Sequence, residues 1–178
     1  MRFLLVLSAI LLSACQSWHE PSETSPYYAI PVGSKLVLNQ PVTIPAGTAS
    51  VYIQRGQIVP YNGRDTYYAN CKFEVETIRS AAYTVQPDEF VVSKVRQRIE
   101  LNRHFEPGTL VAQTGDSSGD VTSKYYARLF YLESTKQPDV LRMVCGRWDY
   151  RAFSNHLSIQ EIRSALGDMF TLRLSTPS

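Results

Sequence analysis

A row of positive side chains is the first feature of this sequence that could do chemistry. Residues 90–101 alternate between apolar and polar types, which predicts a β-strand with two distinct faces. Lys94, Arg96 and Arg98 share one face at two-residue spacing, within about 14 Å from a rise of ~3.4 Å per residue. Three such cations could bind lipopolysaccharide phosphates or an acidic partner. The same pattern is also typical of a solvated sheet face, or of an edge strand charged against aggregation.

The opposite face of the same strand is apolar and predicts burial. It carries Val91, Val95, Ile99 and Leu101. We therefore expect Val95 and Ile99 to pack into a core while the cations face solvent. A helix lying over the cations would change this expectation, because buried charges need partners such as Glu161.

Aromatic side chains form a second group with binding chemistry. The chain holds 11 tyrosines, with pairs at Tyr67-Tyr68 and Tyr125-Tyr126, and Trp148-Asp149-Tyr150 follows later. Amphipathic rings suit protein interfaces and sugar stacking. The alternative is that these rings form the rim of a β core.

Candidate catalytic groups are sparse. Gly115-Asp116-Ser117-Ser118-Gly119-Asp120 resembles the Gly-Asp-Ser-Gly-Gly string of chymotrypsin-like proteases, but His104 upstream lacks that family's Ala-His-Cys context. Glycine, aspartate and serine in a row instead predict a hairpin loop. The order of its acidic residues is not that of a calcium loop.

The remaining histidines and acids give no catalytic or metal-binding pattern. His19, His104 and His156 are the three histidines, and no two of them have the i, i+4 spacing of a helical metal site. The acidic residues are scattered, and a carboxylate pair of the glycosidase type leaves no local signature. We expect no catalytic residue, no metal and no cofactor, with a hydrolase as the alternative.

The N-terminus has the pattern of an export signal. Arg2 supplies a positive charge, and Phe3 to Leu12 is an almost unbroken apolar run of ten residues. A bilayer-spanning helix needs about 20 apolar residues, so this run fits the shorter h-region of a signal peptide. We assign residues 1–14 to that signal peptide.

The end of this signal, Leu12-Ser13-Ala14-Cys15, resembles the lipobox of Gram-negative bacterial lipoproteins. The resemblance implies cleavage before Cys15, whose thiol carries a diacylglycerol, and it implies palmitate in the lipid anchor. Residue 16 is glutamine rather than aspartate, which in that class favours the outer membrane. The resemblance thus implies a lipid-anchored protein of the outer membrane that faces the periplasm. An ordinary secretory signal is the alternative, and the resemblance implies no activity.

Two cysteines remain if Cys15 is lipidated. In the oxidising periplasm Cys71 and Cys145 are expected to form one disulfide. Two buried free thiols are the alternative. A metal site is disfavoured, because neither cysteine has a second ligand at Cys-x-x-Cys spacing.

The mature chain divides into a tether and one domain. Residues 15–33 are rich in serine, threonine and proline without apolar periodicity, which predicts a flexible tether with a soft boundary near Tyr28 and Ile30. Residues 34–178 are expected to form a single periplasmic β-rich domain.

Short strands separated by turn residues dominate this domain. Arg55-Gly56 and Asn62-Gly63 are turn signals, and the latter favours a hairpin. One helix is expected at residues 159–166, with Ser158 and Glu161 as a capping box. We therefore predict an antiparallel β-sandwich or a partly closed barrel with one short C-terminal helix. The strands are expected at 35–38, 50–53, 71–77, 90–101, 124–133, 140–145 and 170–174.

Charge and location together limit the function. A formal net charge of +2 gives no overall attraction to nucleic acid. We expect a non-enzymatic binding or structural role in the envelope, with membrane attachment by the lipid. The candidate partners are an envelope protein, peptidoglycan or lipopolysaccharide. A periplasmic hydrolase of glycan or peptide is the alternative, and a deep pocket with convergent titratable groups would favour it.

Overall fold

The computed structural model describes residues 22–103, 121–150 and 155–176. These residues form ten β-strands, one α-helix and two 3₁₀ turns. The strands are β1 (Lys35–Leu38), β2 (Val42–Ile44), β3 (Ser50–Gln54), β4 (Gln57–Val59), β5 (Asn70–Val75), β6 (Tyr83–Val85), β7 (Asp88–Arg103), β8 (Val121–Glu133), β9 (Val140–Tyr150) and β10 (Phe170–Arg173). The helix is α2 (Ile159–Leu166), and the 3₁₀ turns are η1 (Tyr61–Gly63) and η2 (Gly167–Met169).

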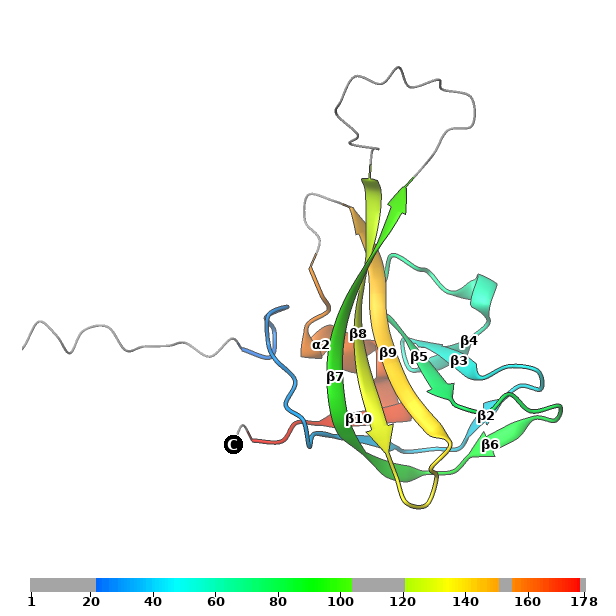
Figure 1. Ribbon diagram of the computed structural model, residues 1–178. Helices are drawn as coiled ribbons and strands as arrows, with labels where there is room; N and C mark the ends of the chain where they lie inside the picture. The colour runs from blue at the N-terminus through cyan, green and yellow to red at the C-terminus, as the bar shows by residue number, and fades with distance from the viewer. Residues whose placement is uncertain (1–21, 104–120, 151–154, 177–178) are drawn as a thin grey trace, which may run out of the picture.

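Eight of the strands form one curled antiparallel sheet, a half-barrel (Figure 1). Their order is β10-β1-β7-β8-β9-β5-β3-β4, and β2 pairs with β6 in a small second sheet. Alternate residues of each strand point into the half-barrel and build the core. The rings of Phe73, Phe90 and Phe170 meet there, with centroids 5.2 to 6.2 Å apart. The mainly β fold with one short C-terminal helix is confirmed.

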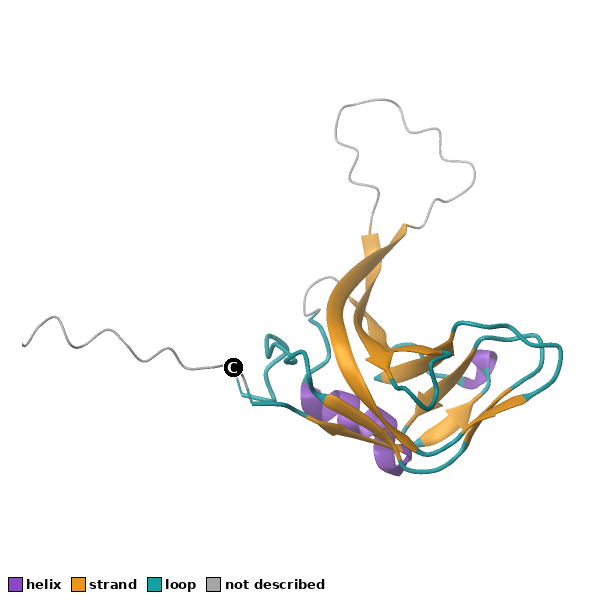
Figure 2. Cartoon of the chain, turned by 60° about the horizontal axis from the view of Figure 1, so that its bottom comes forward, coloured by secondary structure: helices purple, strands orange, loops and turns teal. Residues whose placement is uncertain are grey.

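The helix packs against the half-barrel on the core side. It contacts β3, β5 and β10 through its buried residues Ile159, Ile162, Ala165 and Leu166. Figure 2 shows it lying along one side of the sheet. The capping box is present: the Glu161 amide donates to Ser158 Oγ, and the Ser158 amide donates to Glu161 Oε2 at 2.8 Å. These local bonds fix where the helix begins.

The far end of the helix touches the β3–β4 hairpin, backbone to backbone. The hairpin turns at Arg55 and Gly56, which both have positive φ. The Gly56 amide donates to the Ala165 carbonyl at 3.0 Å. A Cβ placed on Gly167 would lie 2.5 Å from the Gly56 Cα. Only glycines allow the helix end and the hairpin tip to approach so closely.

A disulfide joins two central strands. Cys71 on β5 and Cys145 on β9 are direct cross-strand partners, with Cα atoms 4.0 Å apart. Both cysteines are fully buried in the core. The predicted pairing is confirmed, because alternation placed both side chains on the core faces of their strands.

The alternation predicted for residues 90–101 is wrong in its first half. Opposite β8, Val92 pairs with Leu132 and Lys94 with Tyr131, so Ser93 forms a β-bulge. Because the extra residue shifts the two-residue period by one, the residues before the bulge point to the opposite faces from those predicted. Phe90 and Val92 are therefore buried, whereas Val91 is 41% exposed.

Further along β7 the facing is as expected, but burial is not. Val95 packs against the core. Ile99 and Leu101 are 52% and 47% exposed, although we expected them to be buried. At this end β7 and β8 extend beyond the core (Figure 1).

Asn62-Gly63 is not a hairpin turn. These residues belong to η1, whose Gly63 amide donates to the Pro60 carbonyl at 3.0 Å. The loop that follows is tied to β3, because the Gln54 side chain bonds both the amide and the carbonyl of Asp65. This side-chain bridge replaces the strand pairing that a hairpin would need.

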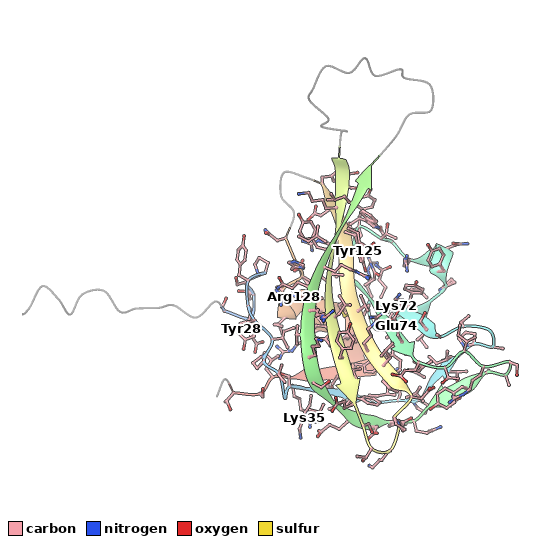
Figure 3. All side chains as sticks on the ribbon, viewed as in Figure 1. Tyr28, Lys35, Lys72, Glu74, Tyr125 and Arg128 are labelled. Carbon is pink, nitrogen blue, oxygen red and sulfur yellow. A yellow bond between two sulfur atoms is a disulfide. The ribbon has the colours of Figure 1, made fainter. Side chains whose placement is uncertain are left out.

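The described part of the expected tether, residues 22–33, contacts the domain. The buried guanidinium of Arg128 donates to the carbonyls of Pro26 and Tyr28. Glu23 accepts from the Ile159 amide and forms an ion pair with Arg163, and Ile30 is buried. Figure 3 shows Tyr28 and Arg128 on the same side of β7. Parts of residues 22–33 thus contact the folded domain, on the N-terminal side of the soft boundary expected at residue 33.

Candidate binding surface

The cationic row, Lys94, Arg96 and Arg98, lies on the outer face of the half-barrel. By cross-strand register, these side chains stand opposite Tyr131, Leu129 and Ala127 of β8, and all three cations are exposed. The helix does not cover them, because α2 packs against β3, β5 and β10. Its Glu161 instead pairs with Arg147 of β9.

The cations of the row differ in how they are held. Lys94 Nζ lies 5.7 Å from the centroid of the Tyr131 ring, which favours a cation–π contact. Arg98 Nε lies 3.0 Å from Glu100 Oε1, and both side chains are about half exposed. Within the described residues, Lys94 and Arg96 have no acidic group at ion-pair distance. The row therefore keeps an excess of positive charge.

A small apolar cluster lies next to the row on the same face. Ala127 and Leu129 of β8 and Val144 of β9 are buried there, with Tyr125 and Tyr131 packed at their sides. Gly146 leaves room for the Tyr125 ring, because a Cβ on Gly146 would come within 2.9 Å of that ring. The outer faces of β8 and β9 are thus closely packed beside the strand that carries the cations.

An ion-pair network borders this cluster on the side of β5. The Glu74 carboxylate accepts from Arg142 and lies 2.5 Å from Lys72 Nζ. Burial alone would raise the pKa of Glu74, but the hydrogen bonds and charges of Lys72 and Arg142 outweigh it and lower the pKa. Figure 3 shows Lys72 and Glu74 beside each other on β5. Here one carboxylate is shared by two cations, so the network keeps one positive charge.

Aromatic rings continue the outer face toward the loop before β5. The Arg64 guanidinium lies 4.0 Å from the Tyr52 ring centroid and 4.5 Å from that of Tyr61. Tyr125 packs on Trp148 with centroids 5.4 Å apart, and burial raises the pKa of its hydroxyl. These contacts give the rings a mainly structural role.

A separate open hollow lies at the β8–β9 hairpin, with a volume of about 860 Å³. Its wall carries the carboxylates of Glu76, Asp88, Glu89 and Glu133. The Asp88 carboxylate accepts from Ser134 Oγ at 2.5 Å and from the Glu89 amide. Burial alone would raise the pKa of Asp88, but its hydrogen bonds and the charge of Lys136 together outweigh burial and lower the pKa. Asp88 therefore remains a carboxylate that anchors the turn.

The two tyrosine pairs that could form a binding surface have different surroundings in the structure. Tyr67 and Tyr68 are both exposed, and the Tyr67 ring stacks on Tyr150 at 5.4 Å. Tyr126 is buried and contacts the edge of the His156 ring. Burial and the nearby Arg128 lower the pKa of His156, so this histidine is neutral at neutral pH. Tyr67 and Tyr68 line an open hollow of about 480 Å³ together with Arg147 and Asp149 of β9, and no residue of the cationic row lines it.

Several residues considered from the sequence lie outside the described part of the chain. They are Cys15, His19, His104 and the loop Gly115–Asp120. Sequence reasoning missed Arg128. Its signal was its place in the buried alternation of Tyr126, Phe130 and Leu132, where an arginine requires an internal partner.

In the described ranges, no helix is both long and apolar enough to cross a bilayer. Within the same ranges, no three His, Cys, Asp or Glu side chains are grouped as a metal site would need. No protein-family model, no curated protein and no solved structure matches this chain. The site is therefore interpreted from its own geometry.

Proposed function

We propose that this protein is a lipid-anchored envelope protein with a non-enzymatic binding role, and that the cationic row binds an anionic partner. The observation that carries the proposal is the row itself: Lys94, Arg96 and Arg98 are exposed on one face, with Glu100 as the one acid paired to them among the described residues. Neighbours in the row are about 7 Å apart, from the rise of a strand. This is within the Debye length of about 8 Å at physiological salt, so the charges reinforce one another.

The anchoring part of the proposal rests on the lipobox. Cys15 is proposed to carry the lipid at the outer membrane, with the domain facing the periplasm. The Cys15→Ser variant should lose palmitate labelling and remain unprocessed or leave the membrane fraction. Cys71→Ser, which removes a core cysteine instead, should keep the label. Unchanged labelling of Cys15→Ser would refute the anchor.

The binding part is tested with two anionic probes, immobilised polyglutamate and vesicles that contain lipopolysaccharide. The full-length protein, kept in detergent for the first probe, should bind one of them and release it as salt rises. Changing Lys94, Arg96 and Arg98 to glutamine should reduce that binding about tenfold or more, because three charge contacts are lost. Circular dichroism would confirm that the variant remains folded.

A matched control removes three exposed cations elsewhere. Its substitutions are Lys35→Gln, Lys136→Gln and Arg173→Gln, which lie on β1, the β8–β9 hairpin and β10. It has the same net charge as the first variant and should bind as the parent does. Equal binding by the parent and the row variant, or no binding of either probe by the parent, would contradict the proposal.

A further inference from the structure

Among the residues that the structure describes, no strand pairs with one edge of β7 beyond Val91. β1 pairs with β7 only from Asp88 to Val91. Val92 then exchanges two backbone hydrogen bonds of 2.8 Å with Gly33 and Ser34. From Lys94 to Leu101, β8 is the one strand among the described residues that pairs with β7. We call Lys94–Leu101 the open edge; it begins beside Val95, which packs against the core, and continues toward the end of β7 that rises beyond the core in Figure 1.

The open edge presents unpaired backbone groups over a considerable length. Eight residues of antiparallel strand extend about 27 Å, from ~3.4 Å per residue. In such a strand every second residue directs its N–H and C=O away from the paired side, so about four residues present both groups. Native sheets usually shorten, bend or cover edges of this kind, because they can accept another strand.

The side chains on the two faces of the open edge specify what could pair with it. The outer face carries the cationic row and Glu100. The inner face carries Val95, the exposed Gln97, Ile99 and Leu101, of which the last two are about half exposed. A strand added here would therefore place alternate side chains beside cations and beside aliphatic groups.

We propose that the open edge binds an extended segment of a partner protein in which acidic and apolar residues alternate. This inference rests on the proposed function, since it names the partner of the same cationic row. Backbone hydrogen bonds would supply the binding common to any added strand. Acidic side chains opposite Lys94, Arg96 and Arg98, and apolar ones opposite Ile99, would supply the specificity.

Charge argues against a second copy of this chain as the occupant. Two copies related by a two-fold axis would pair their β7 edges antiparallel. Centred on Arg96, the pair would oppose Arg96 to Arg96 and Lys94 to Arg98. Centred on Gln97, it would oppose Arg96 to Arg98 twice, and the two Lys94–Glu100 pairs of that register would only offset this repulsion. Like charges directly opposite each other destabilise a sheet, so an acidic strand from another protein fits better.

The test uses a labelled eight-residue peptide of alternating glutamate and valine with blocked ends. It should bind the full-length protein, and binding should weaken with salt. Two further peptides carry N-methyl groups, one on all glutamates and the other on all valines. An added strand bonds through one edge only, so one of the two should lose about tenfold or more in affinity while the other keeps it.

Two independent measurements locate the contact. Hydrogen exchange should slow at alternate amides between Lys94 and Leu101 when the peptide is added. Reversing the row with Lys94→Glu, Arg96→Glu and Arg98→Glu should abolish binding of the acidic peptide and favour a lysine–valine peptide. The same reversal at Lys35, Lys136 and Arg173 should change neither preference.

The outcomes separate this inference from the proposed function. Binding that depends on the row but tolerates both N-methylated peptides would overturn strand addition and leave anionic binding in place. Binding of lipopolysaccharide vesicles through the row, with no peptide binding, would also overturn strand addition. If neither peptide, polyglutamate nor vesicles bind, both proposals fail.

Discussion

Substitution of Gly167 by alanine should destabilise the domain far more than its position at the surface suggests. Gly167 has φ +53° and ψ −141°, a combination that favours glycine. Its added Cβ would lie 2.5 Å from Gly56 Cα and 3.0 Å from Gly56 N. Both neighbours are backbone atoms, so no side chain can rotate out of the way.

The expected cost has a conformational and a steric part. A strained backbone conformation costs about 1–3 kcal/mol. Forcing backbones apart by about 1 Å adds roughly 1–3 kcal/mol, by analogy with overpacked cores. The displacement also weakens the hydrogen bond from Gly56 to Ala165, which is worth about 1 kcal/mol. The sum is about 3–7 kcal/mol, a large fraction of the stability of a small domain.

Gly47→Ala is the matched control. Gly47 has φ +73°, and a Cβ there meets nothing within 4 Å. It should therefore lose only the conformational part, about 1–2 kcal/mol. Urea unfolding, followed by circular dichroism, would compare both variants with the parent. Equal destabilisation of the two variants would show that the contact between Gly167 and Gly56 does not limit packing.

Two further predictions concern the core and the outer face. Reduction of the Cys71–Cys145 bond should lower the unfolding free energy by about 4–5 kcal/mol at most, from the chain entropy of a loop with sequence separation 74. The stability of a variant with alanine at both positions should no longer respond to reductant. An unchanged melting temperature after verified thiol release would contradict this prediction. The lowered pKa of Glu74 predicts stability that is present above its ordinary value of 4.5 and lost as pH falls through the folded-state pKa. The Glu74→Gln variant should be less stable than the parent at neutral pH, and its unfolding free energy should fall less steeply as the pH is lowered. If the unfolding free energies of variant and parent depend on pH in the same way, Lys72 and Arg142 do not act on this group.

The elements that were predicted well depend on local signals. The helix begins after Ser158 and ends before Gly167 because capping is decided by residues within one turn. The disulfide followed from two cysteines that both lie on core faces. By contrast, nothing near Ser93 signals the bulge, since it exists only relative to the register of β8. Such pairings are properties of the sheet and not of a single strand.

The same distinction applies to the candidate site. Two-residue spacing is enough to place Lys94, Arg96 and Arg98 on one face. It could not show that β1 ends its pairing at Val91, and this end point is what leaves the edge open. Nor could it show that Arg128 binds residues 26–28, because a contact over about 100 positions has no local pattern.

The hydrogen bonds from Arg128 to the carbonyls of Pro26 and Tyr28 also limit the distance between the domain and the bilayer, given the proposed lipid on Cys15. A free chain from residue 15 to residue 33 would span up to about 60 Å when fully extended. Because the chain is held from residue 22 onward, only seven residues remain, and they span at most about 25 Å. The point where the chain enters the domain would then stay within about 25 Å of the membrane, in a thin layer next to it. Any partner of its open edge would have to come within that layer.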